Sequence, residues 1–153
     1  MKIAIGSDHR GYTAKEHLKV ALIQKEHEVE DFGTDSTSSC DYPDFAYRVS
    51  DSVRSGRNQV GILLCGTGIG SSMAANKVVG VRAALCHDEL TAEMARRHND
   101  ANVLCLAADL TGESLLQRIA EVWLGTPFDG GRHERRVNQI AQIEAGECDR
   151  RSK

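Results

Sequence analysis

The stretch that most constrains this chain is residues 60–75, VGILLCGTGIGSSMAA. Its first five residues are an apolar run typical of a strand that is buried on both faces of a sheet. The run ends at Cys65, a loop of small residues follows, and helix formers continue over residues 73–77. A strand, a glycine-rich loop and a helix together form an anion site, because the loop amides converge and the helix dipole adds partial positive charge. The sequence therefore predicts that phosphate or a developing oxyanion binds beside Cys65.

The glycine spacing of this loop does not fit three other kinds of phosphate loop. A dinucleotide-binding G-x-G-x-x-G motif needs its third glycine at the position of Ser71. A P-loop ends in Gly-Lys-Ser/Thr, but Gly70 is followed by two serines. A cysteine phosphatase needs an arginine six residues after the cysteine, and that position is again Ser71. A buried cysteine ahead of an ordinary turn remains the structural alternative.

The length and charge of the chain favour one globular domain. With 153 residues the chain can bury its own core, and we assign residues 1–146 to that domain and residues 147–153 to a charged tail. A net charge of −3, with basic residues spread out except near the C-terminus, shows no nucleic-acid footprint. Neither a membrane-spanning stretch nor a signal-peptide pattern is present, so we expect a cytoplasmic protein without membrane contact. The five cysteines include no C-x-x-C pair, which argues against a disulfide framework or a zinc knuckle.

Strand and helix patterns alternate along the whole chain. Helical spacing of apolar residues recurs between the expected strands, and a last helix is expected after Gly130 and Gly131. This alternation predicts an α/β fold, a doubly wound, Rossmann-like, five-stranded parallel sheet with helices on both faces. The last helix has no strand after it, so we expect it on the flank of the sheet or against a second subunit. The expected strands are residues 2–6, 29–32, 60–64, 81–86 and 102–106.

Ligands of such sheets bind outside the carboxyl ends of the strands, where the strand order reverses. Asp8 and His9 follow the first expected strand and Cys65 ends the third, so both loops should open on the same edge. Taken alone, Asp8 and His9 could equally be a helix-capping aspartate with a surface histidine. A shared site is favoured because both loops follow the carboxyl ends of parallel strands.

Two further pairs carry weaker signals. His98 and Asn99 end an expected helix, where a histidine suits the dipole and asparagine is a common cap. Arg132 and Arg136 could be a solvated helix face, yet their spacing of four residues places both guanidinium groups on one side of a helix. Two guanidinium groups placed in this way can bind one phosphate.

Six segments of the chain carry a shared pattern: SDHRGY (7–12), DYPDFA (41–46), CGTGIGSSMAANK (65–77), RAAL (82–85), RRHNDANVL (96–104) and GGRHERRV (130–137). Taken together, they resemble the type B ribose-5-phosphate isomerases, a family that also includes galactose-6-phosphate isomerase subunits. The resemblance runs in the same order from residue 1 to about residue 143. It implies a cytoplasmic, metal-free aldose-ketose isomerase without a cofactor, acting in the pentose phosphate pathway. It also implies a homodimer or a dimer of dimers that builds its active sites between subunits.

The resemblance also implies roles for single residues. Cys65 would be the base that moves a proton between C2 and C1 of ribose 5-phosphate, and Thr67 would assist proton transfer between the enediolate oxygens. His98, helped by Asp8, would open the furanose ring. The amides that would hold the enediolate are those of residues 66–70, including Gly66, Gly68, Ile69 and Gly70.

The remaining roles concern substrate binding. His9, Arg132 and Arg136 would bind the phosphate, while Tyr42 and Asn99 would contact sugar hydroxyls. Two alternatives stay open at this point. The substrate could be allose 6-phosphate or galactose 6-phosphate, or the chain could be a regulator that binds sugar phosphates without catalysis.

Overall fold

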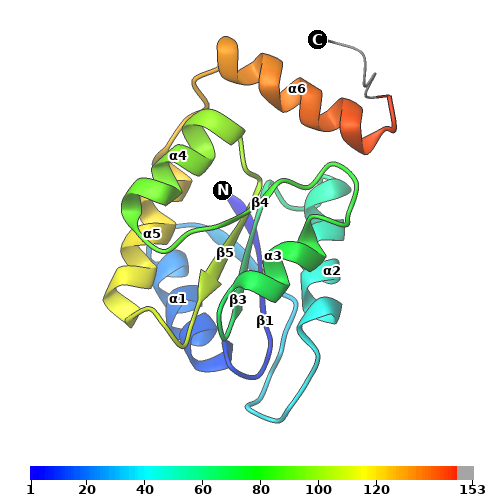
Figure 1. Ribbon diagram of the computed structural model, residues 1–153. Helices are drawn as coiled ribbons and strands as arrows, with labels where there is room; N and C mark the ends of the chain where they lie inside the picture. The colour runs from blue at the N-terminus through cyan, green and yellow to red at the C-terminus, as the bar shows by residue number, and fades with distance from the viewer. Residues whose placement is uncertain (148–153) are drawn as a thin grey trace.

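A computed structural model describes residues 1–147, which form a five-stranded sheet covered by helices (Figure 1). All four strand pairings are parallel, and the strand order is β2-β1-β3-β5-β4. The predicted doubly wound α/β fold is therefore confirmed. The strands are β1 (Lys2–Ser7), β2 (Glu28–Asp31), β3 (Val60–Cys65), β4 (Ala83–Leu85) and β5 (Val103–Ala107).

Helices cover both faces of the sheet. Helices α1, α4 and α5 pack on one face and α2 and α3 on the other (Figure 1). Alternate strand residues point to the two layers, so that Ile62 and Leu64 join one apolar cluster while Leu63 joins the other. The helices are α1 (Tyr12–Gln24), α2 (Tyr42–Arg54), α3 (Ile69–Ala75), α4 (Glu89–Asn99), α5 (Glu113–Gly125) and α6 (Arg132–Glu144).

Two elements are shorter or earlier than the sequence predicted. The helix after the glycine loop begins already at Ile69, because Gly68 adopts the left-handed conformation that precedes the first turn. It ends at Ala75. Strand β4 spans only Ala83–Leu85, since Val81 is drawn into a turn by a hydrogen bond from its amide to the carbonyl of Val78. Asp88 caps the start of α4 in a capping box with Thr91.

Helix α6 lies across the amino ends of the strands rather than on the flank of the sheet (Figure 1). Its neighbour is α4, and His133 is its one buried side chain. Ile140 and Ile143 are 45% and 61% exposed, respectively, so much of the apolar stripe of α6 faces outward. None of the helices within residues 1–147 combines the length and the apolar character needed to cross a membrane.

Candidate active site

Cys65 is the last residue of β3, at the carboxyl edge of the sheet. Its neighbours are β1 on one side and β5 on the other, and the chain reverses its winding direction between β1 and β3. This is the position at which doubly wound sheets bind ligands. The thiol is nearly buried, and its Sγ accepts a hydrogen bond from the amide of Gly68 at 3.2 Å. Such a bond stabilises a thiolate more than a thiol.

Gly68 gives the loop its shape. Its φ of +74° lies in the left-handed region, and a Cβ placed on it would lie 2.3 Å from Leu85 Cδ1. The amide of Ile69 donates to Oγ1 of Thr67 at 3.4 Å, and α3 begins at the same residue. The amides in the first turn of α3, including that of Gly70, have no carbonyl four residues earlier to bond. The loop can therefore present free amides to an anion beside Cys65.

The loop after β1 lies at the same edge. Asp8 is 7% exposed, and its Oδ1 accepts hydrogen bonds from the amides of Arg10 at 2.9 Å and Gly11 at 3.0 Å. Nδ1 of His9 lies 3.2 Å from the carbonyl oxygen of Cys40. The carboxylate of Asp8 thus holds the turn that carries His9. It is not the helix cap that the sequence left open, because the N-cap of α1 is Gly11, without a side-chain capping bond. The second oxygen of Asp8 makes no hydrogen bond within residues 1–147.

Tyr42 completes this edge from the first turn of α2. A Cβ placed on Gly70 would lie 2.6 Å from Cζ of Tyr42, so the phenol ring rests directly on the start of α3. We call Asp8, His9, Tyr42, Cys65 and the loop of residues 66–70 the carboxyl-edge half-site.

The other predicted residues lie at the opposite edge of the sheet. His98 and Asn99 end α4 just before the chain enters β5, and Arg132 and Arg136 lie on α6, which crosses that edge (Figure 1). We call these four residues the amino-edge half-site. Strand β5 alone separates the two edges by roughly 13 Å from Val103 to Ala107, because each strand residue rises about 3.3 Å. A single chain therefore does not bring Cys65 and His98 together.

His133 lies beside the amino-edge half-site, although no role was predicted for it from the sequence. Its ring stacks on that of His98 with centroids 4.1 Å apart and planes 2° from parallel. Burial, followed by the charges of His98, Arg132 and Arg136, lowers the pKa of His133 below its ordinary value. The only sequence signal for this residue was its place between two arginines in the segment GGRHERRV.

The ligand atoms of His98, Asp129 and His133 all lie within 4.8 Å of one another, which is the donor set of a possible metal site. However, both oxygens of Asp129 already accept from Nε of Arg97, at 3.1 and 3.2 Å. Arg132 adds its own charge, since its Nε lies 3.4 Å from Nε2 of His133. This concentration of positive charge suits an anion better than a metal cation.

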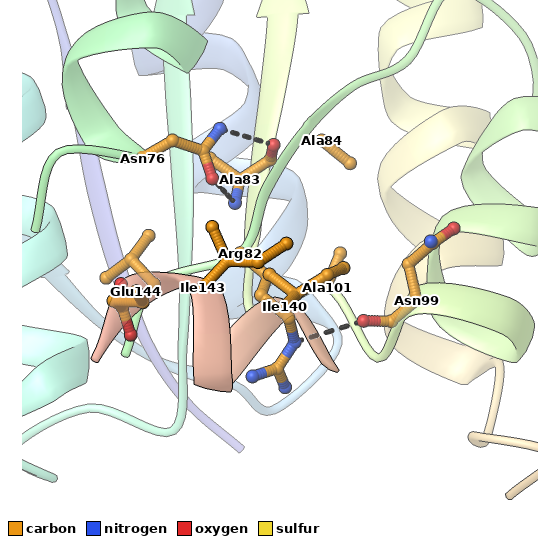
Figure 2. A pocket seen from close by; sticks show the side chains of 10 residues that line it. Asn76, Arg82, Ala83, Ala84, Asn99, Ala101, Ile140, Ile143 and Glu144 are labelled. Atoms are coloured by element: carbon orange, nitrogen blue, oxygen red, sulfur yellow. Dashed lines mark hydrogen bonds between the residues drawn. The ribbon is translucent and has the colours of Figure 1, made fainter. Parts of the chain in front are cut away.

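A groove of about 450 Å³ adjoins the amino-edge half-site. Figure 2 shows Asn99 at one end of it and Glu144 at the other, with Ile140 and Ile143 of α6 along one wall. Nε of Arg82 donates to the carbonyl oxygen of Asn99 at 3.0 Å, which fixes the end of α4 (Figure 2). The groove is mostly apolar, so it does not resemble a phosphate site by itself.

Comparison with known proteins gives a consistent family. The family model described as Ribose/Galactose Isomerase matches residues 3–140. Ribose-5-phosphate isomerase B of Escherichia coli is 43% identical over 143 residues, which cover 94% of this chain and 96% of that protein. The structure of ribose-5-phosphate isomerase B from Clostridium thermocellum is 48% identical, with a TM-score of 0.95 over 97% of this chain and 100% of that one.

A third relative was solved with a ligand. It is ribose-5-phosphate isomerase B of Mycoplasma genitalium with bound ribulose-5-phosphate, which is 44% identical, with a TM-score of 0.90 over 94% of this chain and 96% of that one. The family model, the full-length sequence matches and the fold agree with the resemblance seen in the short segments. This chain belongs to the ribose/galactose isomerase family.

Proposed function

We propose that this chain is an aldose-ketose isomerase that interconverts ribose 5-phosphate and ribulose 5-phosphate. The observation that carries the proposal is the hydrogen bond that the backbone amide of Gly68 donates to Sγ of Cys65. This contact lies in a glycine loop at the switch point of the sheet. It puts a candidate base and candidate oxyanion donors side by side. The choice of substrate is taken from the full-length relatives that are named for this activity.

In the proposed reaction, the Cys65 thiolate removes the proton from C2 of the open-chain aldose. The electrons of the broken C–H bond form the C1–C2 double bond of a cis-enediolate, whose charge the loop amides stabilise. Thr67 passes a proton between the two enediolate oxygens. Cys65 then returns its proton to C1, which leaves the carbonyl at C2 and regenerates the thiolate. The reaction needs no other reactant.

The same proposal assigns substrate binding and ring opening to residues of both half-sites. His98, aided by Asp8, opens the furanose ring, and Asn99 and Tyr42 contact sugar hydroxyls. His9, Arg132 and Arg136 bind the phosphate. Because the two half-sites lie at opposite edges of one chain, this scheme requires a second copy, whose amino-edge half-site faces Cys65 of the first. We therefore propose a homodimer, or a dimer of dimers, in the cytoplasm.

The direct test is to measure conversion of ribose 5-phosphate by the purified protein in the presence of a chelator. Allose 6-phosphate and galactose 6-phosphate serve as comparison substrates. Preferred turnover of ribose 5-phosphate supports the proposal, and preference for a hexose phosphate would change the substrate but keep the mechanism. Binding of sugar phosphates without turnover of any of them would refute the enzyme and leave a sugar-phosphate-binding regulator.

A further inference from the structure

Arg10 is a cation at the carboxyl edge that has no role in the mechanism above. It follows His9 in the loop between β1 and α1, and its side chain is 59% exposed. Its Nε donates a hydrogen bond of 2.6 Å to Oδ2 of Asp109. Within residues 1–147 this is its only side-chain hydrogen bond, so both terminal nitrogens are available.

The ion pair lies against the first residue of the anion loop. A Cβ placed on Gly66 would lie 2.7 Å from Oδ2 of Asp109 and 3.4 Å from Nε of Arg10. The amide of Asp109 also donates to the carbonyl oxygen of Gly66 at 3.0 Å. The absent side chain of Gly66 is thus what lets the carboxylate and the guanidinium approach the loop.

A carboxylate at this position needs an explanation. A sugar phosphate brings about 1.5 to 2 negative charges to the site, and the enediolate adds another. Unpaired, Asp109 would repel both, because like charges at close range disfavour binding. Paired with Arg10, it cancels one positive charge and fixes the direction of the guanidinium.

The geometry of the pair leaves the useful edge of Arg10 open. A guanidinium can bind phosphate through two parallel N–H bonds, and its two terminal nitrogens form one such edge. Asp109 occupies only Nε, so that edge remains free. His9, the neighbouring residue, already belongs to the proposed phosphate site, which places two phosphate-binding side chains on one loop.

We propose that Arg10 binds the phosphate of the sugar-phosphate substrate and that Asp109 is its positioning residue. This inference rests on the proposed isomerase function and extends it. The phosphate is then held from two chains, by His9 and Arg10 beside Cys65 on one chain and by Arg132 and Arg136 on the other.

The test compares substituted chains in steady-state kinetics with ribose 5-phosphate. Arg10→Ala should raise KM about 10- to 100-fold, as expected for loss of hydrogen bonds to a charged group, with a much smaller change in kcat. The inhibition constant for inorganic phosphate should rise by a similar factor. Arg118→Ala is the matched control, because Arg118 is also exposed and also donates from Nε to one carboxylate, that of Glu89 at 2.8 Å. It should leave both constants unchanged.

The double variant Arg10→Ala/Asp109→Ala separates binding from mere charge neutralisation. If Arg10 binds phosphate, the double variant keeps the high KM of Arg10→Ala. If Arg10 only neutralises Asp109, removing both restores KM to the wild-type value, and that outcome overturns the proposal. Circular dichroism and thermal unfolding check that each variant folds.

Calorimetric titration with inorganic phosphate keeps this inference distinguishable from the proposed reaction, since it needs no turnover. A wild-type protein that turns over no sugar phosphate, together with at least tenfold weaker phosphate binding by Arg10→Ala, would refute the reaction and support Arg10. Unchanged phosphate affinity and unchanged KM in Arg10→Ala would overturn the role of Arg10 while leaving the reaction intact.

Discussion

The sulfur of Cys65 lies 3.2 Å from the backbone nitrogen of Gly68, so the candidate base is hydrogen-bonded by its own anion loop. This contact depends on the left-handed backbone of Gly68, which turns the loop back toward the end of β3. The chain offers a second buried cysteine for comparison. Burial raises the pKa of Cys86 to about 11, so that thiol stays protonated at neutral pH.

Replacing Cys65 with alanine should abolish most turnover without unfolding the protein. A general base contributes about 10²- to 10⁴-fold, so kcat for ribose 5-phosphate should fall by that factor. The dissociation constant for ribose 5-phosphate, measured by calorimetry, should change little. Cys86→Ala is the matched control and should keep normal turnover. If Cys65→Ala keeps normal turnover as well, Cys65 is not the base.

Two inactive variants should complement each other if one site combines half-sites from two chains. Cys65→Ala and His98→Asn would each be inactive alone. After unfolding and refolding together, mixed dimers contain one site with both native residues, so about a quarter of wild-type activity should return. The two variants refolded separately and then combined without exchange provide the control. No recovery after verified subunit exchange would place both residues of each site on one chain.

Arg136 and Arg135 are neighbours on α6 with different surroundings. The charge of Arg136 is one cause of the lowered pKa of His133, and Arg136 lies one helical turn after Arg132 on α6. Arg136→Ala should therefore raise KM about 10-fold or more through loss of a charged hydrogen bond to phosphate, and Arg135→Ala should leave KM unchanged. Equal effects of the two substitutions would show that α6 contributes only its overall charge.

Asp31 should make the stability of the fold depend on acid. Burial favours its neutral form, but hydrogen bonds from Lys15, Lys19 and the Gly33 amide outweigh burial and hold the pKa of Asp31 below its ordinary value. A lowered pKa contributes stability above the unfolded pKa of about 3.9, and this contribution is lost as pH falls through the folded pKa. Asp31→Asn should therefore cost about 3 kcal/mol of unfolding free energy at pH 7, since it leaves the buried Lys15 ammonium without its main partner.

Urea unfolding at two pH values checks this expectation. The difference between wild type and Asp31→Asn should shrink as pH falls from about 4 through the lowered pKa of Asp31, because the native carboxyl group is then protonated as well. Asp51→Asn is the control, because Asp51 pairs with Arg54 on the surface and should cost less than about 1 kcal/mol. A difference that is as large at pH 3 as at pH 7 would show that charge is not the cause.

Local patterns were sufficient to predict the elements that place Cys65. The apolar run of β3 and the glycine loop depend on neighbours in the sequence, and both are present. The carboxyl-edge position of Asp8 also followed, because parallel strands share one orientation.

Features set by distant parts of the chain were not predictable in the same way. The length of β4 depends on the turn that captures Val81, and the course of α6 depends on its contact with α4. The stacking of His133 on His98 and the pairing of Arg10 with Asp109 join segments far apart in sequence, and no periodicity encodes them.

The placement of Cys65 and His98 at opposite edges has a consequence for cells that carry both normal and altered copies of the chain. In a dimer of one normal and one altered chain, a change at one of these residues inactivates one of the two sites and leaves the other intact. A chain altered at both residues inactivates both sites, so the dimer has no activity although one of its chains is normal. Under the proposed assembly, the double substitution is therefore dominant, whereas each single one only reduces the yield of active sites.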